Sequence, residues 1–122
     1  MRAETVLQRA IRDRLALRGF VSVHVPNGAV LRGDKLQRAK QMASLKRDGL
    51  MPGFPDLLVY GSQGRIGHVE VKTKGSYQQP SQKDCQRWLE QLGHRYAVCR
   101  SQEDVDETLR EWGWLAEPND LT

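Results

Sequence analysis

The sequence contains little from which a disulfide framework, a zinc site or a membrane span could be built. Its two cysteines, Cys85 and Cys99, match no metal-ligand or disulfide spacing. We expect both to be reduced and to pack as small, buried hydrophobes. No apolar run approaches the ~20 residues that cross a bilayer, and the N-terminus lacks the apolar core of a secretory signal. These absences predict a cytoplasmic protein without membrane contact, and 122 residues predict a single domain over residues 1–122.

Acidic residues are scarce in the first part of the chain. Residues 1–50 hold eleven Lys/Arg and four Asp/Glu, a net charge of +7, whereas residues 51–122 hold eight and eleven, a net charge of −3. A basic half favours a polyanionic partner such as nucleic acid, although a solvated helix face has the same composition. Much of the charge surrounds a helix predicted over residues 35–47, with Asp34 as its N-cap and a modest apolar stripe. We expect this helix to be a mobile or DNA-facing segment that packs lightly on the body.

Apolar periodicity predicts an α/β chain. Two neighbouring strands form an antiparallel hairpin, and a helix connects the second of them to the next strand. Because a helical crossover joins parallel strands, the sheet should be mixed, with helices flanking it. The predicted helices cover residues 3–18, 35–47, 80–92 and 102–112, and the predicted strands cover residues 20–25, 57–60, 66–73 and 95–99.

The predicted hairpin brings two carboxyl groups together. Gly, Ser and Gln between two apolar runs are typical of a turn, and pairing of Tyr60 with Ile66 then places Asp56 opposite, or nearly opposite, Glu70. Directly paired strand residues have Cβ atoms about 5 Å apart, so the two carboxylates repel unless something neutralises them. A hard divalent cation such as Mg²⁺, which needs only one or two carboxylates, would do so.

A lysine belongs to the same cluster. Side chains alternate along a strand, so Lys72 shares a face with Glu70 while Val69 and Val71 point to the other face. Beside a metal, its ammonium group would orient a water nucleophile or stabilise charge on a phosphate. A plainer interpretation stays open, in which Asp56 caps a turn and Glu70 and Lys72 form a solvated pair.

The order of several short motifs is more specific than any one of them. Pro55-Asp56 is followed, after thirteen residues, by Glu70-Val71-Lys72. This arrangement resembles the PD-(D/E)xK nuclease superfamily, and its flanks resemble the VRR-NUC family, the virus-type replication-repair nucleases. The resemblance extends from Glu4 to about Arg100. The flanking motifs are Pro26-Asn27-Gly28, Leu45-Lys46-Arg47-Asp48-Gly49, Pro52-Gly53-Phe54, Thr73, Gly75 and Gln82.

The resemblance implies a restriction-endonuclease-like α/β core and an Mg²⁺- or Mn²⁺-dependent DNA endonuclease that hydrolyses phosphodiester bonds in replication, repair or recombination. The chain has no separate specificity domain, which favours branched, junction or flap DNA over a defined sequence. One small domain would need a homodimer to reach both strands. The alternative is the same fold used as a DNA-binding module without cleavage, against which the intact Asp56, Glu70 and Lys72 argue.

The resemblance also implies roles for individual residues. The metal ligands would be Asp56, Glu70 and the backbone carbonyl of Val71, with Glu4 as a further candidate. Glu4 has an equally good explanation as a first-turn acid favoured by the helix dipole. Lys72 and Gln82 would complete the catalytic set, Gln82 by orienting Lys72 or the water; otherwise Gln82 is an inward polar residue at the edge of the core. The candidate DNA contacts are Asn27, Arg32, Lys35, Arg38, Lys40, Lys46, Arg47 and Lys74.

Three further expectations concern single side chains. His24 has no evident partner in sequence, so we expect a packed or hydrogen-bonded histidine and no ligand role. The first helix turns to the core an apolar face, which includes Val6, Ile11 and Leu15. Four arginines are then left to contact solvent or phosphate: Arg2, Arg9, Arg12 and Arg18. Helical spacing in the third helix turns inward Gln82, Cys85, Leu89 and Leu92.

Overall fold

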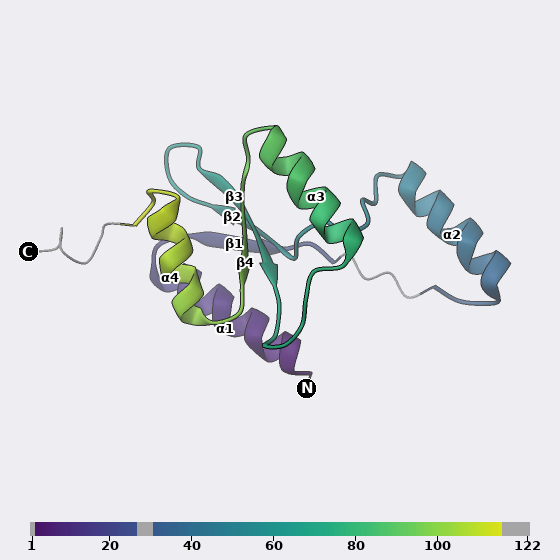
Figure 1. The fold of residues 1–122 in the computed structure, drawn as a ribbon, viewed down its shortest axis with the longest axis horizontal. Helices are drawn as coiled ribbons and strands as arrows, with labels where there is room; N and C mark the ends of the chain where they lie inside the picture. The colour runs from purple at the N-terminus through teal and green to yellow at the C-terminus, as the bar shows by residue number, and fades with distance from the viewer. Residues whose placement is uncertain (1, 27–30, 116–122) are drawn as a thin grey trace, which may run out of the picture.

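The computed structural model describes residues 2–26 and 31–115, and its elements follow the predicted order (Figure 1). The candidate contact Asn27 lies outside the described residues. The helices are α1 (Ala3–Leu17), α2 (Lys35–Arg47), α3 (Pro80–Gln91) and α4 (Gln102–Glu111), and the strands are β1 (Val21–His24), β2 (Leu57–Tyr60), β3 (Ile66–Val71) and β4 (Arg95–Cys99). No helix of the described residues is long and apolar enough to span a bilayer.

The four strands form one mixed sheet in the order β1-β2-β3-β4. The pairs β1/β2 and β2/β3 are antiparallel, whereas β3 and β4 are parallel and are connected through α3. Tyr60 pairs with Ile66, as the turn between them predicts. Leu57 pairs with Val69, so the next position along the hairpin places Asp56 opposite Glu70.

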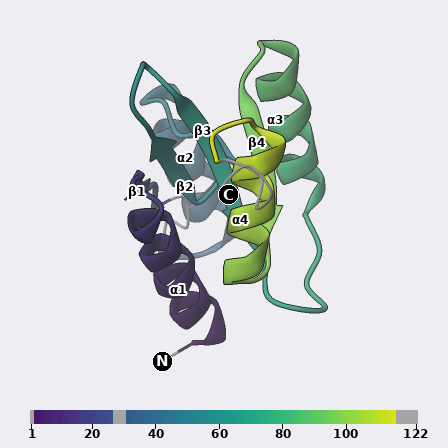
Figure 2. The same ribbon diagram turned by 90° about the vertical axis from the view of Figure 1, so that its left-hand side faces the viewer.

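The sheet separates two apolar clusters. The larger one lies between the sheet, α1 and α4, and the smaller one lies under α3. Figure 2 shows α1 and α3 on opposite sides of the strands. Val69 and Val71 belong to the larger cluster, so alternation turns Glu70 to the α3 side. The larger cluster contains Ile11, Leu15, Phe20, Leu57, Val59, Val69, Val71, Cys99, Val105, Leu109 and Trp112, and the smaller one contains Cys85, Leu89 and Tyr96.

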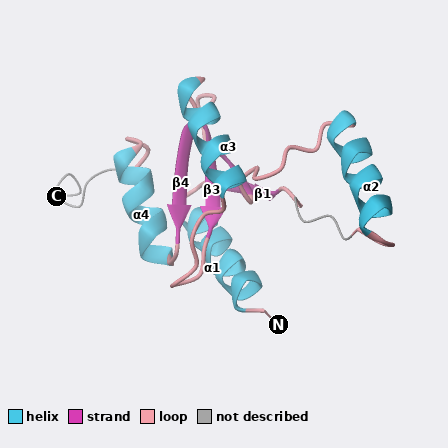
Figure 3. Ribbon diagram, turned by 45° about the vertical axis from the view of Figure 1, so that its right-hand side comes forward, coloured by secondary structure: helices cyan, strands magenta, loops and turns pink. Residues whose placement is uncertain are grey.

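Helix α2 stands apart from the rest of the molecule (Figures 1 and 3). None of its residues is buried, and Leu36 in its apolar stripe is 64% exposed. A capping box holds its first turn: Asp34 accepts a hydrogen bond from the Gln37 amide, and Gln37 Oε1 accepts one from the Asp34 amide, both at 2.8 Å. This confirms the predicted cap and the light packing.

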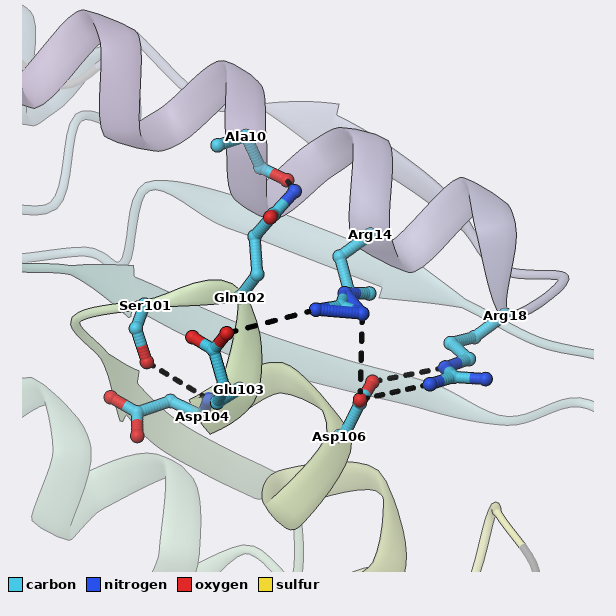
Figure 4. A network of polar contacts seen from close by, with 8 residues as sticks. All are labelled: Ala10, Arg14, Arg18, Ser101, Gln102, Glu103, Asp104 and Asp106. Atoms are coloured by element: carbon cyan, nitrogen blue, oxygen red, sulfur yellow. Dashed lines mark hydrogen bonds and ion pairs between the residues drawn. The ribbon is translucent and has the colours of Figure 1, made fainter.

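Polar contacts join α1 to α4 (Figure 4), the two helices that cover the face of the sheet opposite α3. Arg18 donates two hydrogen bonds to the Asp106 carboxylate, at 3.0 and 2.9 Å, and Arg14 lies 3.6 Å from the same group. Gln102 Nε2 donates to the Ala10 carbonyl at 2.9 Å. The expectation that Arg18 serves solvent or phosphate is therefore wrong, because the acidic face of α4 neutralises it.

Most predicted core positions are confirmed. Cys85 and Cys99 are free and buried. Two helix positions differ, because Val6 is 53% exposed and Leu92 is 57% exposed. Val6 lies in the first turn of α1, and Leu92 follows the last turn of α3 as its C-cap. The apolar periodicity of a helix continues to its last turns, but the sheet that would cover those turns does not extend as far, so apolar residues at the helix ends stay exposed.

Candidate active site

Asp56 and Glu70 meet where β2 begins and β3 ends. One Asp56 carboxylate oxygen accepts a hydrogen bond from the Val71 amide at 2.8 Å. This bond ties the residue before β2 to the neighbouring strand and fixes the Asp56 side chain. Glu70 is only 2% exposed. The register brings a half-buried and a fully buried carboxyl group to the same end of the hairpin.

The segment before β2 packs directly on the start of α3. Gly53 has φ +81° and no room for a side chain, because a Cβ atom there would overlap the Ser81 carbonyl and crowd the Gln82 amide. Pro55 is fully buried. The Pro-Gly-x-Pro-Asp motif thus has a structural role: it lets the backbone pass under α3, which places Asp56 beside Glu70.

Gln82 connects the cap of α3 to Glu70. Its Oε1 accepts a hydrogen bond from the Gln79 amide at 2.7 Å, completing a capping box. Its Nε2 then points at Glu70 Oε1, at 3.4 Å. The predicted inward orientation of Gln82 is confirmed, and its contact is with the carboxyl group.

The Glu70 carboxyl group is buried and incompletely paired. Its Oε2 atom has no hydrogen-bond partner among the described residues. Burial raises the pKa of Glu70 to about 9, and so do a hydrogen bond shared with the Asp56 side chain, which forms when Glu70 is protonated, and the charge of Asp56. Lys72 acts in the opposite direction, and Glu4 adds to the increase. The unpartnered oxygen is therefore that of the ionised carboxylate. A buried polar atom without a partner normally indicates a missing ligand or water.

A cleft of about 470 Å³ opens above the two carboxyl groups. Asp56 and Glu70 line it together with Gly53, Phe54, Ser81 and Gln82 from the α3 side. Glu4 and His24 line it from α1 and β1. The cleft therefore collects polar groups from elements that are distant in sequence.

Glu4 lies at the mouth of this cleft and is exposed. Among the described residues, no group of three or more His, Cys, Asp or Glu side chains is close enough together to hold a metal ion. The structure thus brings together Asp56 and Glu70 and leaves Glu4 outside the pair. A hard cation still fits here, because buried Glu70 has an unpartnered oxygen and both side chains supply oxygen ligands.

Lys72 is half-buried and follows the last residue of β3. Its backbone amide donates to the Cys99 carbonyl at 3.1 Å, which extends the strand and keeps Lys72 on the face of Glu70. Lys72 is not among the residues that line the described cleft. It is near enough to Glu70 for its charge to lower the pKa of that carboxyl group. Its catalytic role stays a prediction.

His24 was not predicted as a site residue, yet it lines the cleft. Its Nδ1 lies 3.1 Å from the Asp56 carbonyl, which can only accept, so Nδ1–H donates. In the neutral imidazole this leaves Nε2 as an acceptor. The feature that places His24 at the site is the pairing of β1 with β2, which sets His24 opposite Leu57, beside Asp56.

The described candidate DNA contacts are exposed basic side chains on and around α2, and Lys74 beyond β3. The chain leaves β1 for α2 and returns to β2 at the sheet end where Asp56 lies. The basic helix therefore extends from the end of the sheet at which β2 begins (Figure 1), and Asp56, which lines the cleft, lies at that end. Those described are Arg32, Lys35, Arg38, Lys40, Lys46, Arg47 and Lys74.

Sequence comparison assigns this mixed sheet, with its paired carboxyl groups at the end of the hairpin, to a nuclease-type family. The model of the VRR-NUC domain family matches residues 2–103, so the chain belongs to the VRR-NUC family, which is of nuclease type. A search of curated proteins gave no match.

Two solved structures share the fold. One, described as "VRR_NUC domain", has a TM-score of 0.62 at 24% identity, over 88% of this chain and 94% of its own. Another, described as "VRR_NUC domain protein", has a TM-score of 0.66 at 20% identity, over 92% of this chain and 88% of its own.

Proposed function

We propose that this protein is an Mg²⁺- or Mn²⁺-dependent endonuclease that hydrolyses phosphodiester bonds in branched, junction or flap DNA. The observation that carries the proposal is the buried Glu70 carboxyl group, with one oxygen unpartnered, beside Asp56 in a cleft of a VRR-NUC domain. Such a group is costly to bury without a partner. A cation bound in the cleft would neutralise both carboxylates and remove that cost.

The metal would be held by Asp56, Glu70 and the backbone carbonyl of Val71, with Glu4 at the mouth of the cleft as a further ligand. When bound, the metal supplies positive charge for the scissile phosphate and lowers the pKa of a coordinated water. The Val71 amide keeps Asp56 in place, and Gln82 holds Glu70.

The remaining residues would act on the reacting groups. Lys72 stabilises negative charge on the phosphate or orients the water. Gln82 is the residue that positions Glu70, and through it the metal set. The exposed arginines and lysines of α2 bind the DNA backbone near the cleft, as their charge and position favour. Two copies of the domain would act together on two strands in the cytoplasm.

A cleavage panel tests the proposal. Labelled flap, junction, nicked and linear DNAs are incubated with the protein and Mg²⁺ or Mn²⁺, beside Asp56→Asn as the matched inactive control. We expect cleavage of a branched substrate that depends on metal and is lost in Asp56→Asn. Binding of DNA without cleavage of any substrate, with either metal, would instead identify a nuclease-fold binding module. Sedimentation of the protein with its preferred substrate would reveal whether two copies bind.

A further inference from the structure

The candidate cleft continues along α1 as a groove. A second cavity of about 470 Å³ shares Glu4, His24 and Asp56 with the cleft. A third cavity, of about 300 Å³, shares Arg9 and Arg12 with the second. The three cavities form one path from the paired carboxyl groups, between α1 and the edge strand β1. The path ends beside residues 20–22.

The groove has a basic wall. Arg2, Arg9 and Arg12 line it, and spacings of seven and three residues put them on one face of the helix. They span about 15 Å along α1, long enough to contact more than one phosphate of a single strand. Besides Asp56 and Glu70 at its start, two acids line the path, Glu4 and Asp13. Arg14 and Arg18, which bind α4, project from the opposite side of α1.

Arg12 is held in position before any ligand arrives. Its Nε donates to Ser22 Oγ and its Nη2 donates to the Ser22 carbonyl, both at 3.1 Å. Ser22 is 8% exposed, so the anchor belongs to the rigid sheet. A guanidinium carries five N–H donors in a fixed plane, and these two bonds use two of them. Arg12 is thereby suited to hold a phosphate with little loss of side-chain entropy.

We infer that one strand of the nucleic acid lies in this groove, with Arg9 and Arg12 holding its phosphates on the way to Asp56 and Glu70. The inference rests on the proposed function and adds to it the path of the strand that is cut. Helix α2 extends from the same end of the sheet, away from the groove, and would contact a different part of the substrate. The groove fixes where the cut strand lies relative to the paired carboxyl groups, and its arginines and those of α2 both contribute to affinity.

Binding without cleavage tests the path. The affinity of the full chain for a short fluorescein-labelled single strand and for a branched DNA is measured by anisotropy in EDTA, between 50 and 200 mM salt. Arg9→Gln/Arg12→Gln is compared with Arg87→Gln/Arg95→Gln, which removes the same charge from exposed arginines outside the groove. Circular dichroism and thermal melting check that each variant folds.

The groove variant should lose two phosphate contacts. We expect its logarithmic salt slope on the single strand to fall by about 1.4, and its Kd at low salt to rise on the order of tenfold, with little change in the control. Ser22→Ala, which keeps the charge but removes one of the two bonds that hold Arg12, should weaken binding slightly without changing the slope. If the double variant does not fold, Arg9→Gln alone should lower the slope by about 0.7.

The failures are distinguishable. If the native protein binds and cuts DNA but the groove and control variants have the same Kd and slope, the path is wrong and the proposed function stands. If the native protein binds neither DNA, the proposed function fails, and the path fails with it.

Discussion

At the scale of single residues, Glu70 is the side chain that the fold accommodates least well. A hydrophobic residue at this position would face the apolar cluster under α3 at no electrostatic cost. The carboxyl group instead stays buried next to Asp56, with its pKa raised to about 9. Functional sites are where such local conflicts are expected, because the conflict is resolved by a ligand.

The conflict should be measurable as pH-dependent stability. Between its ordinary value of 4.5 and about 9, Glu70 is ionised in the unfolded chain and protonated in the metal-free fold. The native state then binds more protons, so stability falls as pH rises, by at most about 1.4 kcal/mol per pH unit. Glu70→Gln should remove this slope and be more stable than the native protein at pH 8. Urea unfolding in EDTA from pH 5 to 8 measures it, and parallel curves for both proteins would show that Glu70 is not protonated.

Lys72 makes a separate prediction about chemistry. Because a protonated lysine is a poor metal ligand, Lys72→Ala should keep the fold, metal binding and most DNA affinity while cleavage falls on the order of 10²–10³-fold. Lys72→Arg should also cut poorly, since a planar fork does not replace a compact ammonium. The measurement is single-turnover cleavage of a branched DNA with Mg²⁺. A Lys72→Ala rate within a few-fold of native would reduce Lys72 to a surface partner of Glu70.

At the scale of elements, the helices and strands were predictable where their signals are local. The bounds of α2 follow from the Asp34 cap and the Asp48-Gly49 stop, and the register of the hairpin follows from the turn at residues 61–64. Asp56 and Glu70 could therefore be paired from the sequence. The pairing of β1 with β2 spans the whole of α2, and no local signal sets it. His24 was missed for that reason.

Helix α2 is the element whose sequence serves a partner more than the core. It has no buried residue and stands apart from the sheet, so its charges can change without loss of packing. We predict that replacing Arg38, Lys40, Lys46 and Arg47 by Ala leaves thermal stability nearly unchanged and lowers the logarithmic salt slope for duplex DNA by about 3.6. With about six phosphate contacts, native affinity should fall roughly a thousandfold between 50 and 200 mM salt. A native slope near zero would contradict an electrostatic DNA contact.

At the scale of the whole molecule, α1 joins the site to the far end of the chain. Its first turn brings Glu4 to the cleft, one face lines the groove, and the opposite face binds α4 through Arg14 and Arg18 (Figure 4). The Arg18–Asp106 contact spans 88 residues of sequence. No pattern in either helix alone indicates it, because each charged face is equally consistent with solvent.

The α1–α4 contact should make the stability of the fold depend on pH in the acid range. The hydrogen bond from Arg18, and then its charge and that of Arg14, lower the pKa of Asp106 below its ordinary value of 3.8. A depressed carboxyl pKa stabilises the fold above the unfolded value, and this contribution disappears as pH falls through the folded value. Asp106→Asn should therefore lower Tm by about 2–5 °C at pH 7 and by progressively less below about pH 4.

Glu107→Gln is the matched control for Asp106→Asn, because Glu107 is an exposed acid on the same helix. It removes the same charge and should leave Tm nearly unchanged at both pH values. Melting curves at pH 7 and at about pH 3 decide the matter. An Asp106→Asn deficit that is as large in acid as at neutral pH would mean that the loss comes from packing, and that the ion pair does not hold α1 against α4.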